Sequence, residues 1–242
     1  MEPYFIWNGR DSREMGVVIT ELPPIILPAE RAEQVTIPGR SGTLTRTEGE
    51  AVYDGYIKTI QLANRRAVDM REIAVWLRGE GTLILSSEPG YSYRARVIQE
   101  AQMSRVFRNT YQGAVSFAVQ PLRAQVPVEA DIAGDTTGTT LTLYNPGDVT
   151  ARPVIRVTGS GTVTLSTDRG SMEIEIPDGA TGFVLDTDAG VITDSALTMN
   201  LGEYVSFEDD GLAAFWLPKG STTLTWDGTV TALTVTPRWR WL

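Results

Sequence analysis

The second half of the chain carries short segments in which apolar and polar residues alternate, and this pattern restricts the fold more than any other feature. In residues 162–166, Val163 and Leu165 alternate with threonine and serine, and in residues 172–176 Ile174 and Ile176 alternate with glutamates. Further examples are residues 183–185, 223–226 and 233–236. Because side chains on a β-strand point alternately to its two faces, each segment predicts a strand with one buried face.

Turn-forming residues separate these segments. Glycine, proline, asparagine and aspartate gather at residues 145–148, 168–170, 177–179, 188–190, 218–220 and 227–228. Short strands with turns at such intervals predict an all-β sandwich or jelly roll. Residues 238–242 are expected to form the final strand, with Trp239 and Trp241 on one side, and this strand could pack back onto the first half. The expected core comprises Val154, Ile155, Val157, Leu165, Ile174, Ile176, Leu185, Phe215, Leu224 and Leu233.

The first half predicts strands around a single helix, an α+β arrangement that is sandwich-like or barrel-like. Asp69 followed by Glu72 resembles a capping box, and Gly79 stands where a C-terminal cap belongs. The residues at helical spacing are Met70, Ile73, Ala74 and Leu77. Strands are expected at residues 4–9, 16–20, 34–37, 56–62, 82–85, 91–98 and 114–119. Pro121 is expected to end the last of these strands, because proline cannot donate a ladder hydrogen bond.

Charge divides the chain at nearly the same place as the pattern. Residues 1–126 hold 15 basic and 14 acidic residues, whereas residues 127–242 hold 6 basic and 16 acidic residues. We therefore predict two domains, residues 1–125 and residues 126–242, which meet different neighbours. Neither domain is basic enough to predict nucleic-acid binding. No run of about 18 apolar residues predicts a membrane span, and the acidic N-terminus does not resemble a signal peptide, so we expect synthesis and retention in a cytoplasm.

Two residue types that catalytic sites often use are missing. The chain has no Cys and no His. Disulfides, thiol chemistry, Ser-His-Asp and Cys-His arrangements and zinc sites of the Cys/His type are therefore excluded. The remaining nucleophile arrangement, a Ser-Lys dyad, would have to use Lys58, which lies in a predicted strand, or Lys219, which lies in a predicted turn.

Acidic residues are the remaining candidates for chemistry. Glu173 and Glu175 share one face of a predicted strand, which is the ordinary pattern of a solvated sheet face, and the acidic run 208–210 resembles an exposed turn. Asp186 and Asp188 begin like a calcium loop, but the later ligand positions are missing. We therefore expect no enzyme activity, no catalytic residue, no cofactor and no metal site.

The order of motifs in the first half resembles the distal tail family of siphophages, which forms the baseplate hub. Its most diagnostic piece is IPGRSG at residues 37–42. The other matching motifs are FIWNG at 5–9, MGV at 15–17, IAVWL at 73–77, GTLIL at 81–85, YSYRA at 91–95 and VSFAVQP at 115–121. The second half resembles the galectin-like sandwich that follows in this family, through YNPG at 144–147, ARPVI at 151–155, FVLDT at 183–187 and LPKG at 217–220.

The resemblance implies a structural protein of the virion, at the tip of a long non-contractile tail. It implies a homo-hexameric ring whose first domains surround a channel through which phage DNA passes. The ring would contact the tail tube protein, a tail-associated lysin or hub protein, and a receptor-binding protein or fibre, without membrane anchoring. Two alternatives remain open. A carbohydrate-binding module acting in host adsorption would need an exposed platform of tryptophans such as Trp216 and Trp226. A hydrolase on a jelly roll would need two converging acids.

Overall fold

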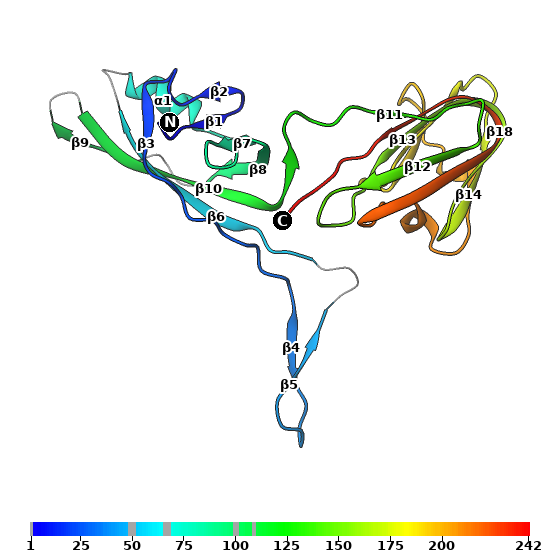
Figure 1. Cartoon of the computed structure of the whole chain (residues 1–242), viewed down its shortest axis with the longest axis horizontal. Helices are drawn as coiled ribbons and strands as arrows, with labels where there is room; N and C mark the ends of the chain where they lie inside the picture. Colours follow the sequence, from blue (N-terminus) through cyan, green and yellow to red (C-terminus); the bar gives the residue numbers. More distant parts are fainter. Residues whose placement is uncertain (1, 48–51, 65–68, 99–101, 108–109) are drawn as a thin grey trace. The chain divides into compact units, whose positions relative to one another are not determined.

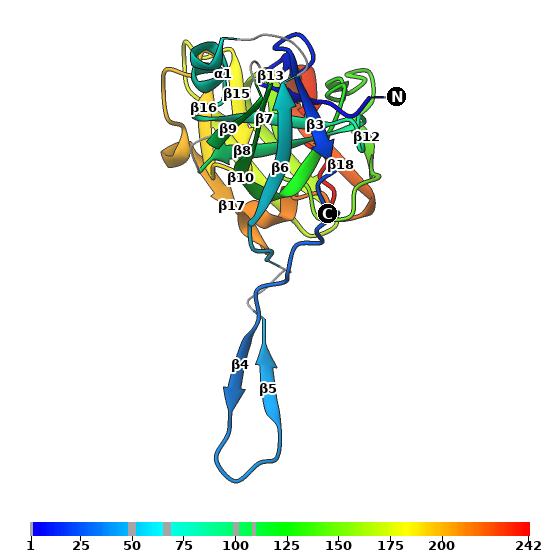
Figure 2. The same cartoon turned by 90° about the vertical axis from the view of Figure 1, so that its left-hand side faces the viewer.

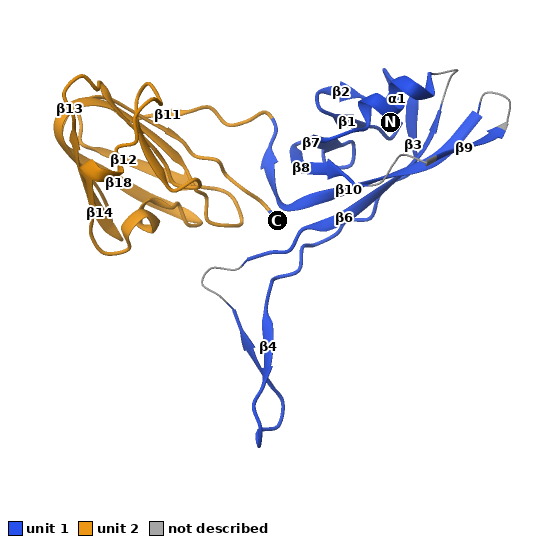
Figure 3. Cartoon of the chain, turned by 180° about the vertical axis from the view of Figure 1, so that it is seen from behind, with its two compact units in different colours: residues 1–126, 242 blue, residues 127–241 orange. Residues whose placement is uncertain are grey.

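A computed structural model describes residues 2–47, 52–64, 69–98, 102–107 and 110–242. The chain divides into two compact units, residues 1–126 with Leu242 and residues 127–241 (Figure 3). Both units consist mainly of antiparallel strands, and the described residues include one α-helix. The expectation of a mainly β protein with a single helix in its first half is therefore confirmed. Among the described residues, no helix has the length and apolar character needed to cross a membrane.

Unit 1 is built on one eight-stranded antiparallel sheet (Figure 1). The strand order is β2-β1-β7-β8-β10-β6-β3. Strand β9 pairs with the first part of β10, and β8 pairs with its later part. The strands are β1 (Phe5–Trp7), β2 (Arg10–Asp11), β3 (Val17–Glu21), β6 (Tyr56–Asn64), β7 (Glu80–Leu85), β8 (Tyr91–Val97), β9 (Gln102–Phe107) and β10 (Thr110–Gln125). Strand β9 was not expected from the sequence, because its MSRV core lacks a regular alternation.

The helix α1 (Met70–Trp76) begins where the sequence predicts. The carboxylate of Asp69 accepts a hydrogen bond from the backbone N–H of Arg71, so Asp69 is the N-cap. The buried helix face differs from the prediction, because Trp76 is buried and Ala74 is exposed. The indole of Trp76 stacks on Phe5 with ring centroids 5.3 Å apart. This large aromatic contact turns Trp76 toward the core and leaves the small Ala74 on the solvent side of the helix.

Strand β10 continues through Pro121, which contradicts the prediction that this proline ends it. The pairing of β10 with β8 is interrupted between Val119 and Arg123 and then resumes to Gln125. An irregularity of this kind removes the need for a ladder hydrogen bond at the proline. A strand can therefore contain Pro121 and still extend to the end of the unit.

Unit 2 is a second eight-stranded sheet, in the order β11-β18-β13-β14-β17, with β12 beside β18, β15 beside β13 and β16 beside β15. Its strands are β11 (Ile132–Ala133), β12 (Thr140–Asn145), β13 (Val154–Thr167), β14 (Gly170–Ile176), β15 (Gly182–Asp186), β16 (Val191–Asp194), β17 (Val205–Phe207) and β18 (Gly220–Thr236). Two short 3-10 helices, η1 (Gly202–Tyr204) and η2 (Gly211–Phe215), flank β17.

The two long strands of unit 2, β13 and β18, pair with each other, and each pairs with two further strands. The first part of β13 pairs with β15 and its second part pairs with β14, while β18 pairs with β12 in its first part and with β11 near its end. The register between β13 and β18 shifts near Gly159 and Ser160. Strands that bend at such irregularities carry one sheet around a core.

The Asp227-Gly228 pair lies inside β18, and the prediction of a turn between two strands there is wrong. Gly228 has a φ of 100° and stands opposite Val163. A Cβ at this glycine would lie 2.3 Å from the carbonyl oxygen of Thr162, so only glycine fits this close approach. The sequence signal marks an irregularity of a continuous strand and not its end.

The ten residues predicted for the core of unit 2 are all buried, as predicted. The final segment differs from the prediction, since β18 ends at Thr236 and Arg238 has a φ of 56°, a conformation outside β-strands. Trp239 is buried nevertheless, and Trp241 packs partly against the same core. Tryptophans that belong to the core cannot form an exposed sugar platform.

Candidate interaction surfaces

The side chains considered for catalysis are not brought together. Glu173 and Glu175 are exposed on the outer face of β14, whose other face is in the core. Lys219 lies on the surface, 3.5 Å from a carboxylate oxygen of Asp148. Among the described residues no group of three acidic side chains is arranged to hold a metal ion. These positions fit the solvated roles that the sequence suggested.

Lys58 is the exception, because it is 2% exposed on the inner side of β6. Its Nζ lies 4.9 Å from the centre of the Tyr93 ring. Nearby, the carboxylate of Glu88 accepts hydrogen bonds from the Tyr93 hydroxyl and from Arg123, which also donates to the carbonyl oxygen of Leu242. Burial lowers the pKa of the Lys58 ammonium, and the nearby Glu88 carboxylate opposes this shift only in part.

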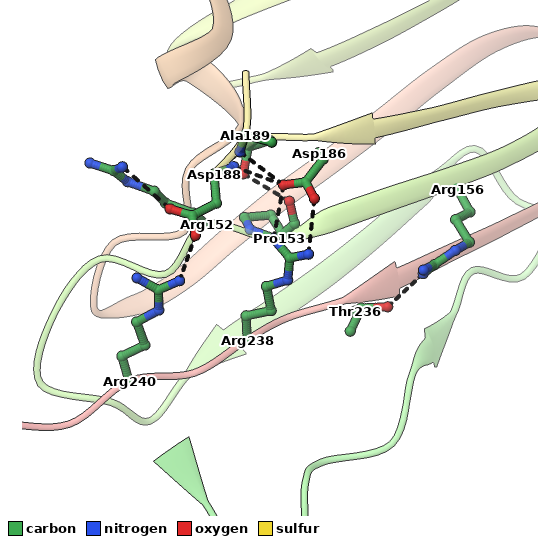
Figure 4. Close-up of polar contacts among 10 residues, drawn as sticks. Arg152, Pro153, Arg156, Asp186, Asp188, Ala189, Thr236, Arg238 and Arg240 are labelled. Atoms are coloured by element: carbon green, nitrogen blue, oxygen red, sulfur yellow. Dashed lines mark hydrogen bonds and ion pairs between the residues drawn. The ribbon is translucent and has the colours of Figure 1, made fainter. Parts of the chain in front are cut away.

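Asp186 and Asp188, the start of the apparent calcium loop, bind arginines (Figure 4). Arg238 donates to both carboxylate oxygens of Asp186 at 2.8 and 2.9 Å. Asp188 lies 2.9 Å from Arg240 and 3.4 Å from Arg152. Three guanidinium groups therefore face two carboxylates, and this surplus of positive charge disfavours a cation. We call these five side chains the arginine clasp.

The arginine clasp fixes the segment after β18. The hydrogen bond from Arg238 keeps the pKa of Asp186 below its ordinary value, with help from the backbone N–H groups of Asp188 and Ala189. For Asp188, burial is the largest single effect and raises the pKa, but the hydrogen bonds and positive charges of Arg240 and Arg152 together outweigh it, so the pKa is lowered. Two ion pairs and the buried Trp239 thus hold residues 238–240 against the sandwich.

A long arm between β3 and β6 exposes several apolar side chains of unit 1. It begins with the proline-rich residues 22–28, where Ile25 is 78% and Leu27 80% exposed. Strands β4 (Glu33–Thr36) and β5 (Thr43–Arg46) then form a separate two-stranded sheet (Figure 2). At the base of the arm, Arg31 pairs with Asp54 at 2.6 Å. An isolated hairpin of this kind is at best marginally stable in water.

The two faces of this arm differ in character. Val35 is directly opposite Leu44, and the neighbouring pair on that face is Glu33 with Arg46. The other face carries only uncharged polar side chains, from Gln34, Thr36, Thr43 and Thr45. The apolar face has no core of its own in the described structure, so it is a candidate contact for another molecule. The sequence predicts a strand at residues 34–37, but neither its pairing with β5 nor its exposure.

A second exposed apolar feature lies in unit 2, in the loop that follows β16. Leu197 is 69% exposed and has a φ of 59°, which is unusual for a leucine. No sequence pattern indicates it, because the run from Asp194 to Met199 mixes polar and apolar residues without a regular period. The carbohydrate alternative gains no support here, since Trp226 and Trp239 are buried and Trp216 lies against the guanidinium of Arg152.

No family model matches the sequence, and no curated protein does either. Solved structures do match. The crystal structure of the Dit protein of phage SPP1, a paradigm of the hub adsorption apparatus in phages that infect Gram-positive bacteria, matches 100% of both chains with a TM-score of 0.73 and 14% identity. A chain of the phage p2 baseplate, in its activated conformation with strontium, matches 97% of both chains at 9% identity, but its TM-score of 0.49 is too low to argue from. The chain therefore shares the fold of the SPP1 Dit protein over its full length.

Proposed function

We propose that this chain is a structural distal tail protein of a long non-contractile phage tail, and that it acts as a hub in the virion. The observation that carries the proposal is the common fold with the SPP1 hub protein over the full length of both chains. The missing His and Cys and the separated carboxylates agree with a protein that binds other proteins and catalyses no reaction.

Six copies form a ring through unit 1, and DNA passes through the central channel. Closing such a ring requires a head-to-tail contact, in which two different surfaces of each copy meet. The arm supplies one of these surfaces, because its apolar face with Val35 and Leu44 needs cover. The acidic unit 2 is suited to the outside of the ring, where like charges keep neighbouring copies apart.

The ring joins the tail tube protein on one side to a tail-associated lysin or hub protein on the other. Unit 2 offers docking positions to a receptor-binding protein or fibre. The fold shared with the SPP1 hub protein and the different charges of the two units support these assignments. The chain reaches its place after synthesis in the host cytoplasm.

The first experiment measures particle mass in solution by light scattering over a range of concentrations. The chain should be a hexamer, or a mixture of monomer and hexamer. Changing Val35→Asp together with Leu44→Asp should leave only monomer, because each buried aliphatic side chain contributes about 1.5–3 kcal/mol to a contact.

The matched control places the same charges on the other face of the arm, through Thr36→Asp and Thr43→Asp, and should still assemble. A stable dimer at all concentrations contradicts the ring, and equal assembly of the two variants contradicts the contact that we assign to the arm. Antibody labelling of assembled tails tests the position of the ring, which should be at the tip.

A further inference from the structure

The loop between β16 and η1 presents two apolar side chains to solvent. Leu197 is 69% and Met199 40% exposed, and both follow directly after the edge strand β16. This strand pairs only with β15 among the described strands, and the loop closes on it through a bridge between Thr193 and Asn200. The two side chains therefore stand at the edge of the sandwich without belonging to its core.

The backbone at Leu197 is held in an unfavourable conformation. A φ of 59° brings the Cβ of an ordinary residue close to the following carbonyl, so only glycine, asparagine and aspartate adopt it readily. A leucine keeps such a conformation only where the surrounding contacts enforce it. A free surface loop would gain stability by placing a glycine at this position.

Asp194 provides this enforcement. Its side chain accepts hydrogen bonds from the backbone N–H groups of Thr198 and Met199, both at 2.7 Å, and from the Thr198 hydroxyl at 2.9 Å. The N–H of Leu197 donates to the Asp194 carbonyl at 3.0 Å. These hydrogen bonds, above all that from Met199, lower the pKa of Asp194, so the carboxylate stays charged and the loop stays closed. The loop is thus rigid before any partner arrives.

The part of the chain around this loop is acidic. Residues 170–218 contain ten Asp and Glu residues and no Lys or Arg. The arginine clasp neutralises Asp186 and Asp188, and Asp194 is enclosed by its own loop, but Glu203, which follows the loop directly, is exposed. A surface that covers Leu197 and reaches Glu203 is therefore complementary when it carries Lys or Arg beside an apolar centre. Unit 2 of another copy, which is acidic itself, does not meet this requirement.

We propose that Leu197 and Met199 are the anchor of a docking site for a different protein of the particle, one with an apolar pocket edged by Lys and Arg. The proposal rests on the proposed function, because it names the place on unit 2 where a peripheral tail protein docks. A few buried residues near the centre of an interface carry most of the binding free energy. An anchor on a loop that is already ordered also avoids the entropy cost of ordering that loop on binding.

The test uses particles assembled with the full chain. A photo-crosslinking benzoylphenylalanine replaces Met199, and a second version carries it at the exposed Glu175 on β14. The version at position 199 should form an adduct with another particle protein, at an apolar site flanked by Lys or Arg, and the version at 175 should not. Adding Leu197→Asn should reduce the adduct about tenfold or more, the effect of losing one buried aliphatic side chain.

Folding and binding are separated by the choice of variants. Asparagine and glycine both suit a φ of 59°, so Leu197→Asn and Leu197→Gly should leave the thermal unfolding temperature unchanged or raise it while weakening docking. Asp194→Asn keeps one acceptor oxygen and the backbone carbonyl that binds the Leu197 N–H, so it should leave Leu197 in place. It should speed hydrogen exchange at the Thr198 and Met199 amides and weaken docking less than Leu197→Asn does.

Four results would overturn the proposal. Two concern the partner: adducts only between copies of this chain, or adducts with an acidic surface. The other two are equal adducts from both positions and no effect of Leu197→Asn. A chain that enters particles and gives no adduct at 199 refutes this site alone. A chain that is absent from particles refutes the proposed function as well.

Discussion

The arm of unit 1 and the sandwich of unit 2 are both made of alternating strands, yet they use their apolar residues in opposite ways. In the sandwich, Val163, Leu165 and their counterparts on facing strands are buried among one another. In the arm, Leu44 and its partner Val35 belong to no core cluster of the described residues. The same pattern thus yields a self-contained core in one place and an unsatisfied surface in the other.

The difference lies in the number of strands that each segment can pair with. A strand such as β13 has neighbours on both sides and an inner face buried in the core, whereas among the described strands β4 and β5 pair only with each other. The sandwich therefore completes its own folding, and the arm depends on contacts outside its own hairpin.

The largest expected effect comes from separating the two regions. A chain of residues 128–242 should be folded, rich in β-structure and monomeric, because its core is complete. A chain of residues 1–126 should still associate, because it keeps the arm. Circular dichroism and light scattering measure both properties. A ring formed by the isolated sandwich, with a monomeric first half, would reverse the roles of the two units.

A single truncation in each region sharpens the comparison. Phe183→Ala should lower the free energy of unfolding by about 3–5 kcal/mol, because it opens a cavity in the fully buried core. Leu44→Ala should change the stability of the monomer by less than about 0.5 kcal/mol, as exposed positions do. Urea denaturation at low protein concentration compares them. Equal losses would mean that the arm packs within its own copy.

The arginine clasp provides a smaller and pH-dependent effect on the sandwich alone. Arg238→Ala should cost about 1–2 kcal/mol at pH 7, since both partners retain some solvent exposure. The pKa of Asp186 is lowered in the folded chain, so its contribution is present above the ordinary value of 3.8 and is lost as pH falls through the folded value. The variant should therefore lose less stability than the natural chain between pH 5 and pH 2, a range chosen to span the titration of an ordinary carboxyl. Parallel curves would contradict this role of the clasp.

The smallest effect is expected for Lys58 in unit 1. Lys58→Met should be neutral or should raise stability by about 1 kcal/mol, because a buried ammonium with incomplete compensation is replaced by an apolar chain of similar length. The folded-state pKa of Lys58 is lowered, so the unfolded chain binds more protons between that value and 10.5, and the gain should shrink as pH rises through this range. Thermal unfolding at pH 7 and pH 10 measures it. A clear loss would show that the ammonium makes a necessary contact.

Much of the fold follows from the sequence because alternation and turn residues act locally. The core of the sandwich and the cap at Asp69 are direct consequences of such patterns. Pro121 and Gly228 are different, because their effect depends on a neighbouring strand. A strand continues through Pro121 because the pairing with β8 is interrupted there and needs no hydrogen bond from the proline. Asp227-Gly228 forms no turn because the backbone at Thr162 lies close to Gly228.

The candidate surfaces were harder to predict for a related reason. Leu44 and Leu165 look alike in sequence, and only the absence of a covering layer distinguishes the first. The strained backbone at Leu197 is held by hydrogen bonds to the Asp194 side chain, and no residue type in the loop predicts this conformation. The sequence suggested the start of a cation site at Asp186 and Asp188. Their partners Arg238 and Arg240 lie 52 residues later in the chain, so the local pattern does not reveal the ion pairs.

The place of β18 in the sandwich also has a consequence for synthesis on the ribosome. This strand follows every other strand in the chain, yet it pairs with β11, β12 and β13 and lies between them. Until it has left the exit tunnel, β12 has no partner and one side of β13 stays open. Unit 1, whose last strand ends at Gln125, can fold while the rest is still being translated. The nascent sandwich therefore exposes aggregation-prone edges for most of its translation, and this interval is where a chaperone would protect the chain.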